Sequence, residues 1–335
     1  MADADQPLLT IVTATYNLVS AGREKRFRQC VESVHAQSCL AQIEHLVVDN
    51  ESNDGTAELL KGYADRGYFK VVSKKDHSVY EGMNNGLAEA RGKYIAYLNS
   101  DDFLCNRTEL ARALKELETS GADYCFGDVD VLNPDDSFCT IWKGATDGLP
   151  FAHNYCHQSM IVKTELLRSL GGFDLSYKVS SDSDLMLRLY HDGRPYIHSA
   201  YKFATYRLGG LSTASRAVSQ ADHAMAFHKY FGQSAGLTLE QCKGLWDFEC
   251  AKTGGIEECL ELLVKIPEAH WRKAWLEALG PLSRPGSLLA VEPKDEKQAN
   301  DHLWQRFRNK YRHFGVIGVL SAIGRRLPFA KRRRR

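Results

Sequence analysis

The chain has 335 residues, of which 44% are hydrophobic and 25% are charged, and its formal net charge is +1. This composition is that of a globular protein, and the length allows one large α/β domain plus a second unit. The polar, acidic N-terminus excludes an ordinary secretory signal, and no apolar stretch reaches the roughly 18 residues that a membrane-spanning helix needs. Nine scattered cysteines without metal-binding spacing predict reduced thiols in a cytoplasm.

Strands and helices are expected to alternate along the first third of the chain. Short apolar runs predict strands at residues 8–13, 43–48, 69–73 and 94–98. Apolar residues at helical spacing predict helices at 23–37 and 56–66, and a further helix precedes the last of these strands. This alternation is typical of an α/β protein with a mostly parallel sheet flanked by helices.

Each of these strands runs into a polar loop with side chains that could bind a ligand. In chain order the loops carry Thr15, Tyr16, Asp49, Asp76, Asp101 and Asp102. Open α/β sheets bind ligands outside the carboxyl ends of their strands. Two neighbouring carboxylates can hold a hard divalent cation, whose usual partner is a phosphate. The alternative is that Asp101 or Asp102 only caps the helix that begins near Arg107.

A helix at residues 107–120 and a pair of strands around a turn, at 123–131 and 137–142, are expected next. Between residues 152 and 211 the pattern is less regular and richer in polar groups, with a helix expected at 180–189. From about residue 216 onward the chain is mostly helical and carries no motif that indicates a function.

The order and spacing of the polar motifs resemble the inverting family-2 glycosyltransferases of the GT-A fold. The resemblance covers about residues 8–212 and rests on Thr15-Tyr-Asn17, Asp49, Asp54-Gly-Thr56, the stretches 76–86 and 92–102, His157-Gln158, Gly171-Gly-Phe-Asp174, Asp182-Ser-Asp184 and Tyr206-Arg-Leu-Gly-Gly210. It implies a GT-A domain at residues 1–215, with a nucleotide-binding half at about 1–103 and an acceptor half at about 104–215. A helical extension at 216–301 and a basic amphipathic tail at 302–335 would follow.

The resemblance also implies a binding site for the nucleotide of a sugar donor. Asp49 matches the carboxylate that accepts a hydrogen bond from the uracil ring, which makes a UDP-sugar the expected donor. Thr15 and Tyr16 match the wall on which the base and the ribose rest. Asp76 and Asp101 match carboxylates that border the nucleotide.

Metal and acceptor residues follow from the same resemblance. Asp101 and Asp102 match the motif that binds Mg²⁺ or Mn²⁺ at the diphosphate, with Asp102 as the stronger candidate for direct ligand. Asp182 lies where the family keeps its general base. His157 and Arg207 are candidates for a contact with the acceptor or with phosphate.

Other interpretations of these residues remain open at this stage. Asp182 could be the N-cap of its helix, Asp49 a turn former, and His157 a satisfied, partly buried histidine. The chain also departs from the family pattern at Ser78, Glu81 and Gly82, where close relatives carry Gly, Asp and Ala. These departures border the donor site and leave the sugar unassigned.

The favoured function is inverting transfer of a hexosyl or related group from a nucleotide sugar to a hydroxyl of a glycan or lipid-linked acceptor, in polysaccharide or lipopolysaccharide biosynthesis. A cation neutralises the leaving diphosphate, and a carboxylate serves the acceptor hydroxyl as base. One alternative is a sugar nucleotidyltransferase, which would need a Gly-rich, Arg- or Lys-bearing loop after the first strand. The other is a non-catalytic membrane-associated scaffold, which would be marked by loss of Asp102 or Asp182.

The C-terminal tail indicates a second partner. Residues 302–312 interleave apolar and basic side chains, and the chain ends in a basic run at 331–335. Such a segment suits an anionic membrane surface, where each Lys or Arg adds roughly 1 kcal/mol. We expect a cytoplasmic protein that is peripheral at the inner face of the plasma membrane. No nucleic-acid-binding signature accompanies the charge, and the remaining alternative is a solvated tail.

Overall fold

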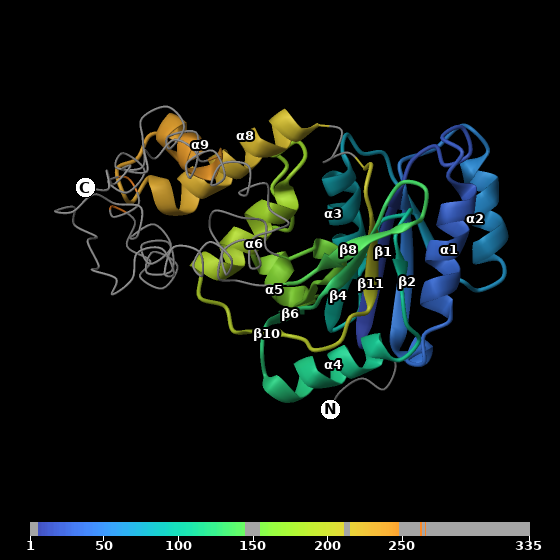
Figure 1. Cartoon of the computed structure of the whole chain (residues 1–335). Helices are drawn as coiled ribbons and strands as arrows, with labels where there is room; N and C mark the ends of the chain where they lie inside the picture. Colours follow the sequence, from blue (N-terminus) through green and yellow to red (C-terminus); the bar gives the residue numbers. More distant parts are fainter. Residues whose placement is uncertain (1–5, 145–154, 211–214, 248–261, 263–264, 266–335) are drawn as a thin grey trace, which may run out of the picture. The chain divides into compact units, whose positions relative to one another are not determined.

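The computed structural model describes residues 6–144, 155–210, 215–247, 262 and 265 (Figure 1). The chain divides into two compact units, residues 1–146 with 154–219 and residues 147–153 with 220–335. The basic tail predicted at 302–335 lies outside the described residues. Within the described ranges, no helix is long and apolar enough to cross a membrane.

A seven-stranded sheet forms the centre of the first unit. Its strands lie in the order β10-β6-β9-β4-β1-β2-β3, and all neighbours are parallel except β9, which runs antiparallel to β4 and β6. The strands are β1 (Leu9–Thr15), β2 (Ile43–Asp49), β3 (Lys70–Ser73), β4 (Tyr94–Tyr97), β6 (Tyr124–Phe126), β9 (Ile161–Lys163) and β10 (Tyr196–His198). The predicted mostly parallel sheet is confirmed.

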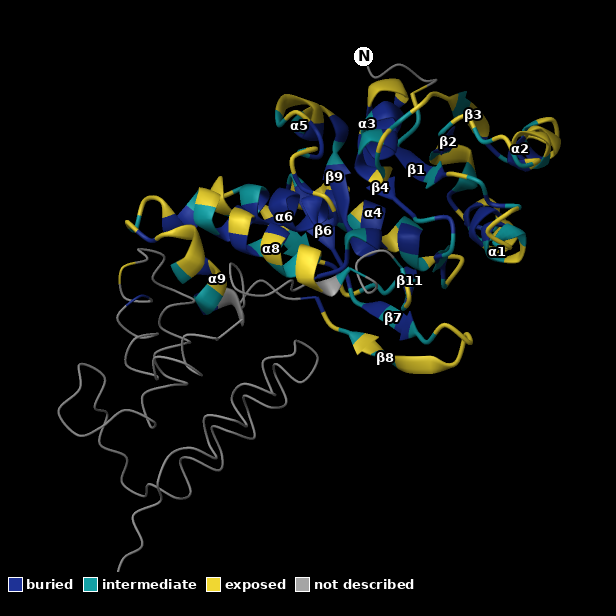
Figure 2. Cartoon of the chain, turned by 90° about the horizontal axis from the view of Figure 1, so that it is seen from above, coloured by how far each residue is buried: buried dark blue, intermediate teal, exposed yellow. Residues whose placement is uncertain are grey.

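Helices cover both faces of this sheet (Figure 2). They are α1 (Glu24–His35), α2 (Thr56–Ala64), α3 (Val79–Glu89), α4 (Glu109–Ser120), α5 (Thr164–Ser169) and α6 (Ser181–His191). α4 buries its apolar side chains with Leu9 and Ile11 of β1, and α1 contributes Cys30 and Val34 to the same cluster. α3 packs on the opposite face, where a Cβ at Gly86 would lie 2.4 Å from Val12 Cγ1. Glycine at this position therefore lets α3 lie directly on the sheet.

A second, four-stranded sheet has the order β5-β11-β7-β8. Its strands are β5 (Phe103–Leu104), β7 (Val129–Leu132), β8 (Phe138–Trp142) and β11 (Ala204–Arg207). The prediction of a single strand at 123–131 is wrong, because this stretch is split into β6 and β7, which belong to different sheets. The break falls at Gly127, where a Cβ would lie 2.7 Å from the carbonyl oxygen of Tyr201. Only glycine allows the chain to pass another backbone this closely.

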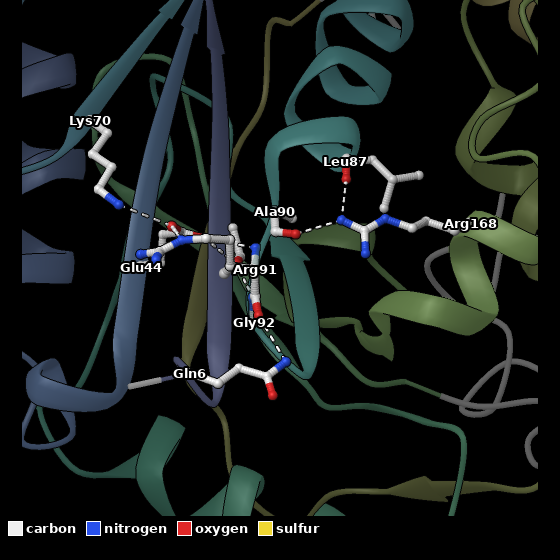
Figure 3. Close-up of polar contacts among 9 residues, drawn as sticks. Gln6, Glu44, Lys70, Leu87, Ala90, Arg91, Gly92 and Arg168 are labelled. Atoms are coloured by element: carbon white, nitrogen blue, oxygen red, sulfur yellow. Dashed lines mark hydrogen bonds and ion pairs between the residues drawn. The ribbon is translucent and has the colours of Figure 1, made fainter. Parts of the chain in front are cut away.

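A buried carboxylate, Glu44, fixes the end of the sheet where β1, β2 and β4 begin (Figure 3). Its side chain is 3% exposed, and Oε1 lies 2.7 Å from Arg91 Nε and 3.4 Å from Lys70 Nζ. Oε2 accepts hydrogen bonds from Thr10 Oγ1 and from Arg91 N, both at 2.9 Å. Burial raises the pKa of Glu44, but the hydrogen bonds from Arg91 and Thr10 outweigh it and lower the pKa below its ordinary value. We call these four residues the Glu44 cluster.

The turn between α3 and β4 is held from both sides by further polar contacts (Figure 3). Arg168 Nη2 donates to the carbonyl oxygens of Leu87 and Ala90, at the end of α3. Gln6 Nε2 donates to the carbonyl oxygen of Arg91 at 3.1 Å. The start of β4 is therefore fixed, and with it the direction in which β4 leads to Asp101 and Asp102.

The described residues from 216 to 247 are mostly helical. α8 (Arg216–Phe227) is followed by the π-helix η3 (His228–Gly232) and by α9 (Leu239–Asp247). The rings of Phe227 and Phe231 stack with their centroids 5.9 Å apart. The remainder of the predicted extension at 216–301 lies outside the described residues, apart from positions 262 and 265.

Candidate active site

The predicted nucleotide residues gather where β1 and β2 end. Thr15 and Asp49 are partners in the register of these two strands, and Thr15 Oγ1 donates to Asp49 Oδ1 at 3.3 Å. Asp49 is 2% exposed, and its carboxylate also accepts hydrogen bonds from Ser52 N at 2.8 Å and Ser52 Oγ at 2.6 Å. Asp49 thus shapes the turn after β2, as the turn-former interpretation expects. Its contact with a base stays a prediction.

Tyr16 projects an aromatic ring from the end of β1. The residue is 51% exposed, although the backbone around it is fixed. Arg23 Nη2 donates to the Tyr16 carbonyl oxygen at 3.1 Å, and Asn17 N donates to Ser52 Oγ at 2.8 Å. Asn17 itself has a positive φ of 47°, which asparagine tolerates better than most residues. A fixed backbone with an exposed ring is suited to stacking on a planar ligand.

Asp76 lies in the loop after β3, and its N–H donates to Asn50 Oδ1 at 2.7 Å. Burial, together with the nearby charge of Glu81, raises the pKa of Asp76 to about 6. A Cβ at Gly82 would lie 2.9 Å from Asp76 Oδ2. Gly82, which stands where close relatives carry alanine, therefore leaves room for the Asp76 carboxylate.

Asp102 is a buried carboxylate in the turn after β4. It is 1% exposed, and its Oδ1 accepts a hydrogen bond from Arg207 N at 2.8 Å. Oδ2 accepts from Gln158 Nε2 at 2.7 Å and from Asn99 Nδ2 at 3.2 Å. All three donors are neutral groups. Burial, together with the neighbouring charge of Asp101, raises the pKa of Asp102 to about 7.

Arg207 is the last residue of β11, and its guanidinium is engaged by this chain. The side chain is 1% exposed, with Nε donating to Asp136 Oδ1 at 2.7 Å and Nη2 to Gln29 Oε1 at 2.6 Å. Nη1 donates to the backbone carbonyl oxygen of Asp101, and the guanidinium lies 5.0 Å from the Phe103 ring centroid. These contacts favour a role in holding the Asp101-Asp102 turn. A direct contact with phosphate or acceptor stays a prediction.

Asp101 and Asp102 have the chemistry that a hard divalent cation requires. No described residue donates a hydrogen bond to the Asp101 carboxylate, and Asp102 Oδ1 accepts only one. Among the described residues no cluster of three or more His, Cys, Asp and Glu side chains could hold a metal by itself. A cation such as Mg²⁺ is commonly bound by one or two carboxylates and completed by substrate phosphates, and this pair fits that pattern.

Asp182 is the second residue of α6 and does not cap it. The N-cap position is Ser180, so the N-cap interpretation of Asp182 is wrong. The Asp182 side chain is 12% exposed. Its Oδ1 accepts hydrogen bonds from the Tyr80 hydroxyl and from Ser183 N, both at 3.0 Å, and Oδ2 lies 3.0 Å from His157 Nδ1.

His157 and Gln158 connect the two carboxylates. They are adjacent in the 3₁₀ turn η2 (His157–Ser159), and the first contacts Asp182 while the second contacts Asp102. Because β9 runs antiparallel to β4, the residues that precede β9 lie where β4 ends. The antiparallel strand β9 therefore places η2 at the edge of the sheet where the parallel strands end and their loops begin. His157 is thus a contact of Asp182, and a direct contact with substrate stays a prediction.

Sequence reasoning assigned no role to three residues that hold these carboxylates. Gln158, Asn99 and Tyr80 all lie inside the motifs that carried the family resemblance. Their adjacency to the assigned residues was a signal, but the partners of Gln158 and Tyr80 are far away in the chain, and only Asn99 lies close to its partner, Asp102. The capping alternative for Asp101 and Asp102 is wrong, since α4 begins at Glu109 with Thr108 in the cap position.

Comparison with known proteins agrees with this geometry. Residues 10–162 match the model of a protein family described as glycosyl transferase family 2. The match runs from β1 to β9 and contains the strand ends that carry Asp49 and Asp102. The chain therefore contains a glycosyl transferase family 2 domain at residues 10–162. The resemblance seen in the motifs is confirmed, and the protein is a glycosyltransferase.

Relatives of the transferase are found in bacteria and archaea. A PGL/p-HBAD biosynthesis glycosyltransferase of Mycobacterium bovis is 28% identical over 215 residues, which cover 62% of this chain and 79% of the relative. The structure of S. aureus TarS 1–349 in complex with UDP-GlcNAc has a TM-score of 0.54 at 17% identity, over 91% of each chain. The mannosyltransferase PcManGT from Pyrobaculum calidifontis, in complex with GDP-Man and Mn²⁺, has a TM-score of 0.56 at 18% identity, over 98% of this chain and 89% of that one. These likenesses establish the GT-A fold of the transferase.

Proposed function

We propose that the transferase moves a sugar from a UDP-sugar to a hydroxyl of a glycan or lipid-linked acceptor, with inversion at the anomeric carbon. The observation that carries the proposal is the pair of buried carboxylates, Asp102 and Asp182, joined through the adjacent residues His157 and Gln158. In this proposal Asp102 helps to neutralise the diphosphate, and Asp182, on the other side of η2, serves the acceptor.

On the donor side, Thr15 and Asp49 hold the base and Tyr16 offers its ring for stacking. Asp101 and Asp102 hold a divalent cation, Mg²⁺ or Mn²⁺, which when bound stabilises the charge of the leaving diphosphate. The solved relatives support a nucleotide-sugar donor, since their complexes contain UDP-GlcNAc in one case and GDP-Man with Mn²⁺ in the other.

On the acceptor side, Asp182 acts as the general base. It takes the proton of the acceptor hydroxyl while the acceptor oxygen bonds to the anomeric carbon. The bond from that carbon to the diphosphate oxygen breaks, and its electron pair leaves with the nucleoside diphosphate. Attack opposite to the leaving group inverts the configuration. Tyr80, Ser183 and His157 fix the carboxylate in one orientation, which general-base catalysis needs.

The test compares the parent enzyme with Asp182→Asn. UDP release from a panel of UDP-sugars and GDP release from GDP-mannose are measured in Mn²⁺, and UDP affinity is measured by calorimetry. We expect turnover to fall by roughly 10² to 10⁴ while UDP affinity hardly changes, because the group faces the acceptor. Near-parent turnover by Asp182→Asn would remove the general-base assignment.

A lipid-linked acceptor would place the transferase at a membrane surface, where it would serve surface polysaccharide or lipopolysaccharide assembly. The support is the sequence of the tail at 302–335 and the mycobacterial relative named for PGL/p-HBAD biosynthesis. The full chain should bind vesicles that contain anionic lipid, and salt should weaken this binding, because charges are screened within about 8 Å at physiological ionic strength. Equal binding by a chain that lacks 302–335 would reduce the tail to a solvated extension.

A further inference from the structure

Tyr80 contacts the proposed base from the opposite half of the first unit. It lies in the first turn of α3, soon after Asp76, and is 5% exposed. Its hydroxyl lies 3.0 Å from Asp182 Oδ1 and 2.6 Å from the carbonyl oxygen of Val179. α3 belongs to the donor side of the sequence and α6 to the acceptor side. Tyr80 therefore ties the orientation of Asp182 to the helix that follows the nucleotide loop.

The two groups that accept a hydrogen bond from this hydroxyl differ in whether they can also donate one. The carbonyl of Val179 can only accept, whereas Asp182 accepts when it is ionised and can donate when it is protonated. A tyrosine hydroxyl has a single proton to donate but can also accept. While Asp182 is ionised, that proton can be given to the carboxylate. Once Asp182 has taken a proton, the carboxylic acid can donate to the tyrosine oxygen, and the tyrosine proton then turns to Val179.

We propose that Tyr80 is a positioning residue that holds the Asp182 carboxyl group in one orientation in both of its protonation states. This inference rests on the proposed role of Asp182 as general base. The proton that Asp182 receives comes from the acceptor hydroxyl, and Tyr80 neither gains nor loses one. Only the direction of the hydrogen bond between its hydroxyl and Asp182 reverses. A phenylalanine ring could fill the same space but could not form this hydrogen bond in either direction.

The chain contains a matched control in Tyr97. The rings of Tyr80 and Tyr97 both pack on Phe173, with centroid distances of 5.3 Å and 4.9 Å. Both side chains are buried, but no described residue forms a hydrogen bond with the Tyr97 hydroxyl. Replacing either tyrosine by phenylalanine removes one buried hydroxyl beside the same ring. Only Tyr80→Phe removes a contact with Asp182.

The experiment is a double-mutant cycle on the full chain. UDP release from UDP-N-acetylglucosamine and GDP release from GDP-mannose are measured in Mn²⁺ for the parent, Tyr80→Phe, Tyr97→Phe, Asp182→Asn and the double variant Tyr80→Phe/Asp182→Asn. We expect Tyr80→Phe to lower kcat by about 10- to 100-fold, the worth of a hydrogen bond to a charged group, with an unchanged donor KM. Tyr97→Phe should keep the parent kcat. In the Asp182→Asn background, Tyr80→Phe should cause no further loss, because its effect acts through the carboxylate.

Three outcomes overturn the inference: parent-like kcat in Tyr80→Phe, an equal loss in Tyr97→Phe, or the same loss from Tyr80→Phe with and without Asp182. Near-parent turnover of Asp182→Asn contradicts the proposed function instead, and this separates the two failures. If neither donor is turned over, crystal structures of the parent and Tyr80→Phe decide. The Asp182 carboxyl group should rotate or lose its defined position in the variant, and an unchanged position overturns the inference.

Discussion

Two buried carboxylates at opposite ends of the same sheet are stabilised in different ways. Glu44, at the start of β2, has Arg91 and Lys70 within 4 Å as well as a hydrogen bond from Thr10 (Figure 3). Asp102, after the end of β4, receives its hydrogen bonds from two side-chain amides and one backbone N–H. The pKa of Glu44 is accordingly lowered, whereas the pKa of Asp102 is raised to about 7. The charge of Glu44 is neutralised by cationic side chains of the same chain, whereas the hydrogen-bond donors to Asp102 are all neutral.

This difference distinguishes a carboxylate that is buried to stabilise the fold from one that is buried to bind a ligand. A buried charge is costly unless it is paired, so a fold that keeps one without a cationic partner accepts a loss of stability there. The Glu44 cluster is complete within the chain and fixes the turn that leads into β4. Asp102, together with Asp101, has the acceptor oxygens that a divalent cation would use. Exchanging the two kinds of carboxylate for neutral side chains should therefore have opposite consequences.

The largest expected effect is on ligand binding by Asp102→Asn. This change removes the negative charge proposed to hold the cation, so Mn²⁺ should no longer strengthen UDP binding, and affinity in Mn²⁺ should fall at least about tenfold. The melting temperature should stay equal or rise, because the variant no longer buries an unpaired charge. Calorimetry with UDP, with and without Mn²⁺, together with thermal unfolding checks both. Parent-like UDP affinity in Mn²⁺ would contradict the metal assignment.

The reciprocal change is Glu44→Gln, which should act on stability alone. It leaves Arg91 and Lys70 without their carboxylate and should lower the free energy of unfolding by about 1–3 kcal/mol, with UDP affinity unchanged. Glu165→Gln is the matched control, because its partner Arg168 is also an arginine but the Glu165 side chain is 83% exposed. Exposed pairs contribute at most about 1 kcal/mol. Equal losses in the free energy of unfolding of both variants would show that burial does not strengthen the contribution of the Glu44 ion pairs to stability.

The smallest effect concerns His45, which follows Glu44 in β2. Burial lowers the pKa of His45 to about 3, and its Nε2 lies 3.1 Å from Thr13 Oγ1. Below about pH 6.5 the unfolded chain binds a proton that the folded chain does not, so stability should fall as pH decreases towards 3. His45 should contribute at most about 1.4 kcal/mol per pH unit to this slope. The free energy of unfolding of the parent should therefore drop more steeply than that of His45→Gln between pH 6.5 and 5, and parallel profiles would rule His45 out.

Much of the sheet could be predicted from the sequence because its signals are local. The strands expected at 43–48 and 94–98 appear as Ile43–Asp49 and Tyr94–Tyr97, since continuous apolar runs mark strands that are buried on both faces. Helix starts are less sharply marked by local patterns: the helix expected from residue 107 begins at Glu109, after a turn in which Thr108 N donates to Asn106 Oδ1. Local patterns therefore located the elements to within a few residues.

The parts that could not be predicted depend on contacts between distant residues. β6 and β7 read as one strand because nothing local reveals that Gly127 must pass the backbone of Tyr201. The distant partners of Asp102 come from β11 and η2, and those of Asp182 come from α3 and η2. Each of these pairings requires the completed fold. The assigned carboxylates could be named from motifs, but the groups that hold them could not.

The 3₁₀ turn η2 has a consequence for how this enzyme can diversify. His157 and Gln158 are joined by one peptide bond, so the distance between their two carboxylate partners is limited by the length of a dipeptide. An insertion of a single residue between them would separate Asp102 from Asp182, whereas insertions in loops that contact neither carboxylate nor its partners would not. We therefore expect changes in acceptor preference to accumulate in the surrounding loops, while the length of η2 remains invariant.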